Sequence, residues 1–468
     1  MNTFKKILIA NRGEIAVRII RTCRDMGIRT VAVYSEADTE SLHVKLADEA
    51  YAVGPPDSLE SYLDIEKTLA VAKDAGVDAI HPGYGFLSEN PEFAEMSEKR
   101  GIAFIGPPSH CMSKAKPKNR ARQLMKMINI PVTPGHDDAI SDTEGKGIDE
   151  AREIAAMLGY PVVIKPIGGG GGIGIMIAKD PNELAKAVRS AESRGRNAFG
   201  VSGCYIEKYL AEAKHVEFQI LADRHGNIVH LGDRDCSVQR RFQKIIEEAP
   251  CPMMTPFLRT KMGIAAIDVA IILQYVGALT VEFFYYPNTK KFYFNEINSR
   301  LQVEHCVTEL VTGVDIVKEQ IRIAAGEPLS LNQDDIRVDG HAIECRINAE
   351  DVTRNFIPSP GIITKLRLPH GPNIRIDEGI YENYDVPFYY DSLLMKLITS
   401  GKSRDEAISR MRRALGELHI KGIKTTAPLH QIIIDDEDFK EGKYTTSLLT
   451  KPELMNKLKN LKYENEAA

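Results

Sequence analysis

A run of five glycines, flanked on both sides by apolar residues, is the feature that most narrowly limits how this chain folds. The run occupies residues 168–172 within PVVIKPIGGGGGIGIM. Glycine accepts positive φ angles, and its backbone N–H groups can approach an anion closely. A Walker loop needs Gly-Lys-Ser/Thr at the start of a helix, and a dinucleotide-binding fingerprint also opens a helix. Here a β-rich apolar segment follows, which predicts a hairpin flap that closes over the phosphates of a nucleotide.

Lys165 ends the apolar strand before the glycines and would supply positive charge to those phosphates. The alternative interpretation is a flexible linker. Linkers, however, usually mix serine with glycine and do not lie between two apolar strands. The flap is therefore the favoured interpretation.

A second constraint comes from VEFFYYPNTKKFYFNE, which is typical of a β-hairpin that turns at PNTKK. If the turn centres on Thr289 without a bulge, Glu282 lies opposite Glu296 and Phe284 lies opposite Phe294. Two carboxylates opposed on one face of a hairpin lie about 5 Å apart and repel each other. One of them is then protonated, or a cation lies between them.

Oxygen ligands favour Mg²⁺ or Mn²⁺ as that cation, and Asn298 lies one step further along the same face. The predicted metal ligands are therefore Glu282, Glu296 and Asn298. The alternative is a solvent-exposed strand face in another register, because a slip of one residue moves every side chain to the opposite face.

The residues that follow the second acid form a candidate catalytic face. Arg300, Gln302 and Glu304 share one side if the chain stays extended. An arginine can hold a carboxylate or bicarbonate with two hydrogen bonds, and a neighbouring carboxylate can accept a proton. Two other candidates are weaker on their own. Lys244 belongs to a basic–acidic run, which is usually a solvated ion-pair network, and an isolated strand residue such as Arg346 is more often structural.

The composition is that of an ordinary globular protein. The chain has 468 residues, of which 43% are hydrophobic and 27% are charged. Its net charge of −5 gives no basic footprint for nucleic acid. The seven cysteines are scattered without CxxC spacing, which indicates reduced thiols in the cytoplasm. No apolar stretch is long enough for a signal peptide or a membrane span.

The order of elements predicts a fold of mixed α/β and α+β type. The first hundred residues alternate strands and helices, which indicates a Rossmann-like parallel sheet with ligand loops at the carboxyl ends of its strands. Residues 215–303 alternate like antiparallel strands. The predicted boundaries are 1–114 for the Rossmann-like domain, 115–334 for a second domain with a lid at about 132–205, 335–447 for a β-rich C-terminal domain, and 448–468 for a tail.

A family resemblance rests on segments that occur in this order: NRGEIAVRI, HPGYGFLSEN, the glycine run, EKYL, RDCSVQRR, EINSRLQVEH, ECRINAED and YYDS. Together they look like biotin carboxylase, the ATP-grasp subunit shared by acetyl-CoA and pyruvate carboxylases. The similarity extends from about residue 3 to residue 447. The resemblance implies that the second domain is an ATP-grasp domain with a mobile glycine-rich lid.

The resemblance also implies an activity. ATP phosphorylates bicarbonate to carboxyphosphate, which breaks down to CO₂ and phosphate, and biotin N1′ captures the CO₂. Biotin would be attached to a separate carrier protein or to a biotinylated carboxyltransferase subunit, because no Ala-Met-Lys-Met motif is present. The implied cofactor is Mg²⁺ or Mn²⁺, and the implied assembly is a cytoplasmic homodimer without nucleic-acid or membrane partners. The final acceptor stays open between acetyl-CoA, pyruvate and another acid.

The family motifs assign site residues by the same resemblance. The bicarbonate and biotin group is Tyr84, Lys244, Arg300, Gln302, Val303, Glu304, Arg346 and Asp391. Within it, Glu304 would be the base and Arg346 would stabilise the biotin enolate, and Lys244 and Arg300 complete the catalytic set. The ATP group is Lys118, Lys165, Gly169, Gly170, Gly171, Gly172, Glu207, Leu210, His215, Gln239, Glu282 and Glu296.

Several positions depart from the family pattern. Phe242 stands where a histidine near the ribose is usual, and Ile173 replaces a basic residue after the glycines. Lys-Pro at 116–117 replaces small, flexible residues, and Cys306 replaces a proline. Leu279 replaces a glycine and is expected to crowd the sheet beside the first acid of the hairpin.

These departures motivate one alternative, a catalytically silent scaffold of a carboxylase complex. A second alternative is another ATP-grasp ligase that acts on an amine or a carboxylate. The retained metal acids and base favour an active enzyme with altered nucleotide affinity.

We expect Phe242→His to tighten ATP binding, because the imidazole would restore a hydrogen-bond partner for the ribose. Titration calorimetry of ATP into both proteins would measure the change. An unchanged or weaker affinity would contradict this interpretation of Phe242.

Overall fold

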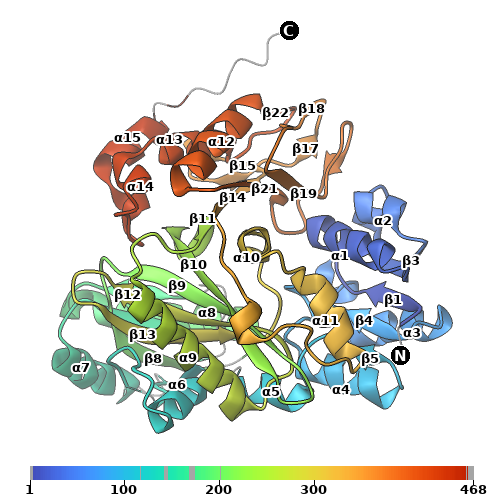
Figure 1. The fold of residues 1–468 in the computed structure, drawn as a ribbon. Coiled ribbons are helices and arrows are strands. Elements are labelled where there is room, and N and C mark those ends of the chain that lie inside the picture. Colours follow the sequence, from blue (N-terminus) through green and yellow to red (C-terminus); the bar gives the residue numbers. More distant parts are fainter. Residues whose placement is uncertain are drawn as a thin grey trace.

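The structure, a computed structural model, describes residues 4–115, 118–136, 138–141, 146–167, 174–200, 202–459 and 461. The expectations for glycines 169–172, for Ile173 and for the Lys-Pro pair at 116–117 therefore lie outside the described residues. Figure 1 shows the N-terminal region in blue beside a central sheet in green, with the C-terminal region in orange and red above them.

The N-terminal region is a parallel sheet with strand order β3-β2-β1-β4-β5, as the alternating pattern predicts. Its elements are β1 (Lys6–Ile9), α1 (Gly13–Asp25), β2 (Arg29–Ser35), η1 (Glu36–Asp38), α2 (Leu42–Leu46), β3 (Glu49–Gly54), η2 (Ser58–Glu60), α3 (Ile65–Asp74), β4 (Ala79–His81), α4 (Pro91–Lys99) and β5 (Ala103–Phe104). Ile7 and Ile9 pack with α1, whereas Leu8 packs in a second cluster, so both faces of the sheet are buried. The loops after β1 and β4 carry Asn11 and Tyr84 to the carboxyl edge of the sheet.

The second region contains a small antiparallel sheet with strand order β7-β6-β8. Its elements are α5 (Ser109–Ala115), α6 (Lys118–Met127), α7 (Lys146–Leu158), β6 (Val162–Pro166), β7 (Met176–Ala178), α8 (Pro181–Phe199) and β8 (Cys204–Lys208). Helix α8 packs on this sheet through Leu184 and Val188. The antiparallel pairing of β6 with β7 confirms the predicted hairpin on either side of the glycine run. That the hairpin closes over phosphates stays a prediction.

A large antiparallel sheet joins the second region to the C-terminal region. In the described part of the chain its strand order is β13-β12-β9-β10-β11-β14-β21-β19. The strands are β9 (Lys214–Ala222), β10 (Ile228–Arg240), β11 (Gln243–Ala249), β12 (Gly277–Tyr286), β13 (Lys291–Asn298), β14 (His341–Asn348), β19 (Ile374–Glu378) and β21 (Leu393–Gly401). The pairing of β11 with β14 connects the two regions.

The alternating pattern predicts strands alone between residues 215 and 303, and this is wrong for helix α9 (Pro256–Leu273). Thr255 caps the helix by accepting a hydrogen bond from the N–H of Leu258. The helix packs against the sheet in one apolar cluster with Phe218. Ile264 and Ile271 are apolar but 53% and 56% exposed. Their apolar character on the outer face hides the helical period.

The hairpin of β12 and β13 places Glu282 opposite Glu296, as predicted. The predicted pairing of Phe284 with Phe294 is wrong, because Phe294 lies opposite Phe283 instead. The turn therefore differs from the predicted register by one residue. An irregularity in β13 just before the second acid restores the pairing of the two glutamates.

The C-terminal region surrounds the far end of the large sheet. Its remaining elements, with those that lead into it, are α10 (His305–Thr312), α11 (Ile316–Ala324), η3 (Gln333–Asp335), β15 (Glu350–Asp351), η4 (Val352–Arg354), β16 (Ile357–Pro358), β17 (Gly361–Ile362), β18 (Lys365–Arg367), β20 (Asp385–Val386), α12 (Arg404–Glu417), β22 (His419–Lys421), α13 (Ala427–Ile434) and α14 (Glu437–Lys440).

The segment expected to be a tail begins with η5 (Leu448–Thr450) and α15 (Pro452–Lys459). Leu448, Leu454 and Leu458 are buried in the same cluster as α12 and α13. The chain is therefore folded to at least residue 459. No helix among the described residues combines the length and apolar character needed to cross a bilayer.

Candidate active site

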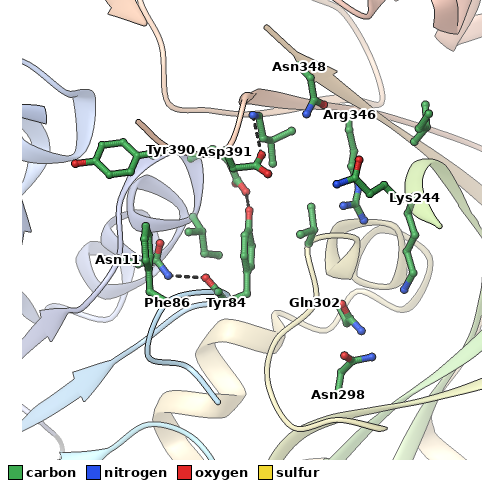
Figure 2. A pocket seen from close by; sticks show the side chains of 18 of the residues that line it. Asn11, Tyr84, Phe86, Lys244, Asn298, Gln302, Arg346, Asn348, Tyr390 and Asp391 are labelled. Atoms are coloured by element: carbon green, nitrogen blue, oxygen red, sulfur yellow. Dashed lines mark hydrogen bonds between the residues drawn. The ribbon is translucent and has the colours of Figure 1, made fainter. Parts of the chain in front are cut away.

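Two cavities lie between the regions of the molecule, and they share a wall. The central cavity, of about 620 Å³, is bordered by the loops after β1 and β4, by the large sheet and by the C-terminal region (Figure 2). The side cavity, of about 660 Å³, lies between the small sheet, the large sheet and helix α15. Both cavities are lined by His215, Arg240, Phe242, Glu296 and Phe356. A ligand that fills the side cavity can therefore reach the central cavity at this shared wall.

Most of the predicted site residues line these cavities. The central cavity is lined by Tyr84, Lys244, Glu282, Asn298, Arg300, Gln302, Val303, Arg346 and Asp391. The side cavity is lined by Lys118, Lys165, Glu207, Leu210 and Gln239. Glu304 lines neither cavity, because its fully buried carboxylate lies behind the side chains of Lys244 and Arg346.

Lys244 on β11 is the centre of the charge network. Its Nζ donates to Glu217 Oε2 at 2.6 Å, to Glu282 Oε1 at 2.8 Å and to Glu304 Oε1 at 2.6 Å. Burial alone would raise the pKa of Glu304, but Lys244 and Arg346 hold that pKa well below its ordinary value. Glu304 is therefore ionised at neutral pH and can accept a proton.

Arg346 on β14 holds the other oxygen of the predicted base. Its Nη2 donates to Glu304 Oε2 at 2.9 Å, and its Nε donates to Glu247 Oε1 at 2.6 Å. Glu304 is thus clamped between two cations, one on each carboxylate oxygen. An anion that bound to these cations would weaken their hold on Glu304 and so raise its proton affinity.

The predicted metal ligands have other partners in this structure. Glu282 Oε2 lies 2.6 Å from His215 Nε2, and its Oε1 accepts from Asn298 Nδ2 at 2.8 Å. Glu296 pairs with the ammonium group of Lys118. Burial would raise the pKa of Glu282, but the lysine on β11 and His215 hold that pKa well below its ordinary value. These carboxylate and amide oxygens, from adjacent strands that line the central cavity, fit a divalent cation such as Mg²⁺.

The side cavity combines cationic and apolar walls. Lys165 pairs with Glu207 at 2.7 Å, and its Nζ donates to Asn295 at 3.2 Å. Burial would lower the pKa of Lys118, but Glu296 raises it, so this ammonium group stays charged. The apolar lining is Val163, Ile175, Ile177, Leu210, Phe284, Leu449, Met455 and Leu458. Such a cavity suits a ligand with an anionic end and a flat apolar end.

Three acids that the sequence patterns did not single out support the predicted residues. The Tyr84 hydroxyl donates to Glu14, and Arg300 Nε donates to Glu89 Oε2 at 3.0 Å. Glu217 forms an ion pair with Lys244 on β11. Glu14 and Glu89 belong to two of the quoted motifs, NRGEIAVRI and HPGYGFLSEN. Glu217 lies two residues after His215 in the predicted strand, so the alternation of side chains could have identified it as a neighbour on the same face.

The described departures from the family pattern lie in different surroundings. Phe242 is 37% exposed in the shared wall. The expectation that Leu279 crowds the sheet beside Glu282 is wrong, because Leu279 is fully buried in the apolar cluster on the opposite face. The buried thiol of Cys306 donates to Asp377 Oδ2 at 3.2 Å.

Comparison with known families covers nearly the whole chain. The profile "Biotin carboxylase, N-terminal domain" matches residues 3–112, and "Biotin carboxylase C-terminal domain" matches residues 344–451. The profile "Carbamoyl-phosphate synthase L chain, ATP binding domain" matches residues 117–332 between them. Fold and profiles together define a protein of the ATP-grasp class.

Individual relatives are similar over most of their length. Biotin carboxylase 1 of Bacillus subtilis (strain 168) is 51% identical over 451 residues, which are 96% of this chain and 99% of that protein. Biotin carboxylase of Nostoc sp. (strain PCC 7120) is 50% identical over 446 residues, which are 95% of this chain and 98% of that protein. A pyruvate carboxylase component of Methanothermobacter thermautotrophicus is 52% identical over 443 residues, which are 95% of this chain and 89% of that protein.

A solved structure is similar over its whole length. The crystal structure of the biotin carboxylase domain dimer of Hydrogenobacter thermophilus 2-oxoglutarate carboxylase, in complex with MgADP, ADP and bicarbonate, has a TM-score of 0.94. It is 45% identical, and the match covers 99% of this chain and 100% of that one. The chain belongs to the biotin carboxylase family, which confirms the resemblance.

We expect Lys244→Met to lower the free energy of unfolding by about 3–5 kcal/mol at pH 7, because three buried carboxylates would lose their shared cation. Lys244 holds the pKa values of Glu282 and Glu304 below their ordinary range. The stability that these acids contribute is therefore present above an unfolded pKa of 4.5 and is lost as the pH falls further.

The difference in Tm between wild type and Lys244→Met should accordingly be largest near neutral pH and should narrow towards pH 4. Thermal unfolding at a series of pH values would measure it. Lys99→Met, at an exposed surface pair, is the matched control and should change stability by at most about 0.5 kcal/mol. A gap in Tm that is independent of pH would show that Lys244 does not compensate these acids.

Proposed function

We propose that this protein carboxylates biotin, using ATP and bicarbonate, on a separate carrier protein, as the first half-reaction of a biotin-dependent carboxylase. The observation that carries the proposal is the clamped carboxylate of Glu304, held by Lys244 and Arg346 beside the paired acids Glu282 and Glu296. A base, two cations that can bind anions and a site fit for a divalent cation thus meet beside the central cavity, and Glu296 also lines the side cavity.

The side cavity would hold ATP. Lys118 and Lys165 would contact its phosphates together with backbone N–H groups of glycines 169–172, and the apolar lining would contact the base. Glu207, Leu210, His215 and Gln239 complete the proposed nucleotide set. The solved biotin carboxylase domain of 2-oxoglutarate carboxylase, crystallised with MgADP, supports this assignment.

Mg²⁺ or Mn²⁺ would be held by Glu282, Glu296 and Asn298. When bound, such an ion neutralises phosphate charge and orients the transferred phosphoryl group. Glu296 lines both cavities, so this set lies between the proposed sites of nucleotide and bicarbonate.

Bicarbonate would bind in the central cavity to Lys244, Arg300, Gln302 and the backbone of Val303. Its negative charge would compete with Glu304 for the lysine and for Arg346. The pKa of Glu304 would then rise at the moment when a bicarbonate proton must be accepted. The low proton affinity of the free site is thus compatible with the proposed role of base.

Biotin would enter beside Tyr84 and Asp391, which line the central cavity opposite the large sheet (Figure 2). Arg346 would stabilise the enolate that forms when biotin loses its N1′ proton. Because carboxyphosphate reacts with water, the lid at about 132–205 would close before the chemistry.

The proposed organisation keeps domain boundaries at 1–114, 115–334 and 335–447, with the segment from 448 following them. The proposed assembly is a homodimer, supported by the dimer of the solved 2-oxoglutarate carboxylase domain. The partner would be a biotin carboxyl carrier protein or a biotinylated carboxyltransferase subunit, and the final acceptor acetyl-CoA, pyruvate or another acid. The free, buried state of Cys23, Cys111, Cys204, Cys236, Cys251, Cys306 and Cys345 supports a cytoplasmic location.

Free biotin with bicarbonate and Mg-ATP tests this function. We expect ADP release to require bicarbonate and to increase when biotin is added, and we expect ¹⁴C from bicarbonate to appear in biotin. Bicarbonate-dependent ADP release that biotin does not change would favour another ATP-grasp ligase. No turnover above background would favour a silent scaffold.

We expect Glu304→Gln to lower the rate of biotin carboxylation by about 10²–10⁴-fold, because the proton acceptor is lost. ATP affinity, measured by titration calorimetry, should stay the same. Glu98→Gln, on the exposed face of α4, is the matched control and should leave both quantities unchanged. A normal rate in Glu304→Gln would mean that another group is the base.

We expect the double variant Glu282→Ala, Glu296→Ala to bind Mg-ATP at least about tenfold more weakly, a loss of about 1.4 kcal/mol. The same variant should lose much less affinity for ATP in the presence of a chelator, because the acids then have no metal to hold. Equal binding of Mg-ATP by the variant and the wild type would refute the proposed metal site.

A further inference from the structure

Two buried carboxyl groups beside the proposed base have too few partners. Glu247 on β11 and Glu344 on β14 are directly paired positions of adjacent antiparallel strands, so their side chains share one face of the sheet. Neither residue is exposed to solvent. Both carboxylate oxygens of Glu344, and Oε2 of Glu247, lack a hydrogen-bond partner among the described residues. Two ionised carboxylates are very unfavourable in such surroundings.

The nearby cations are already engaged. Arg346 donates to Glu247 Oε1 and to Glu304. Lys396 on β21 pairs with Glu14 at 3.1 Å and lies 3.8 Å from Asp377. The ion pairs formed by the described residues leave Glu344 without a cation.

A charge count leads to the same conclusion. The cations in this network are Arg234, Lys244 and Arg346. The acids around them are Glu217, Glu247, Glu282, Glu304 and Glu344. Four of these carboxylates therefore share three cations through ion pairs, and Glu344 is a fifth acid whose opposing cation, Lys396, is already paired with Glu14, so the pair of Glu247 and Glu344 has the weakest compensation.

We propose that Glu247 and Glu344 share one proton at neutral pH and act as a positioning pair for Arg346. With this proton the pair carries a single negative charge. It then holds the Arg346 guanidinium in place without binding it so strongly that it cannot turn towards a substrate anion. The shared proton does not depend on the proposed function, whereas its effect on turnover rests on that function.

The electrostatic surroundings agree with a retained proton. Burial raises the pKa of Glu344 well above its ordinary value, which Lys396 opposes only in part. Burial likewise raises the pKa of Glu247 to about 7, against the influence of Arg346. The other titratable groups that influence the pair or are influenced by it are Lys244 of β11, Cys345 of β14, Lys396 of β21, Cys236 of β10, and Glu304 and Cys306 at the start of α10. Burial raises the pKa of each of these three thiols, so they stay neutral.

Infrared difference spectroscopy of Glu344→Gln against the wild type tests the shared proton. We expect the wild type to show the C=O stretch of a protonated carboxyl group, which shifts after exchange into D₂O. The wild-type minus Glu344→Gln difference spectrum should contain this band, because the amide can donate to Glu247 and leave it ionised beside Arg346. Burial raises the pKa of Glu14 to about 7, and any band from that carboxyl group is common to both proteins and cancels in the difference. Glu98→Gln, an exposed control, should retain the band. A wild-type spectrum without such a band at neutral pH would overturn the proposal.

Thermal unfolding gives a second readout that needs no substrate. Because the folded pKa values of the pair are raised, its contribution to stability is present below the unfolded pKa of 4.5 and is lost as the pH rises through the folded values. Glu344→Gln removes one of the two titrating groups. Its Tm should therefore rise relative to the wild type between pH 5 and pH 8. A Tm difference that does not change with pH would contradict the shared proton.

The pH dependence of kcat tests the positioning role. In the wild type kcat should fall severalfold as the pH rises above neutrality and the pair loses its proton. Glu344→Gln should lack this fall, and its affinity for ATP should not change. A variant with the wild-type profile would refute the positioning role alone. A wild type that does not carboxylate biotin would refute the proposed function and leave the infrared and unfolding results to decide on the proton.

Discussion

The candidate site depends on one mostly buried ammonium group, that of Lys244, whose side chain is 12% exposed. Removing a charge from water is strongly unfavourable, and the cost is offset here because three carboxylates accept hydrogen bonds from the same nitrogen. These acids come from β9, β12 and the N-terminal end of α10, so one side chain on β11 fixes the positions of three other elements. The same contacts keep the predicted base ionised. A substitution of Lys244 therefore changes both the positions of these elements and the protonation of the predicted base.

The three regions contribute different chemistry to the cavities. The parallel N-terminal sheet delivers loops at its carboxyl edge, which carry Tyr84 and the acid Glu89 that holds Arg300. The large antiparallel sheet supplies alternating polar residues, since every second side chain points to the same face. The C-terminal region closes the space with Arg346, Asp391 and, at the side cavity, helix α15. No single region contains a complete set of these groups.

Local patterns predicted much of this arrangement. The alternation of strands, glycines and helices was sufficient to predict the parallel sheet. The two apolar segments on either side of the glycine run predicted the hairpin. The pairing of Glu282 with Glu296 was predicted correctly although the turn differs by a residue, because an irregularity in β13 compensates. Such compensation depends on packing and cannot be seen in a sequence. Helix α9 was missed because apolar side chains also occur on its exposed face.

The candidate site was predictable in part for similar reasons. Residue types indicated Arg300, Gln302 and Glu304, but the extended chain that their spacing assumed is wrong, because β13 ends at Asn298 and the chain turns into α10 at Glu304. The resemblance to a family was needed to assign their roles. Neither source showed that Glu304 is buried behind two cations, or that Glu217 joins the network. Those facts arise from contacts between residues far apart in the chain. They become visible only when the strands are placed side by side.

The pairing of β11 with β14 has a mechanical consequence. Four paired positions, from Ile246 with Cys345 to Ala249 with Ala342, make the second and C-terminal regions parts of one hydrogen-bonded ladder. Rotating one against the other would break backbone hydrogen bonds in a buried sheet. The large sheet thus forms one continuous, rigid wall of the side cavity, whereas β6, β7 and β8 on the opposite side belong to a separate sheet that this ladder does not hold.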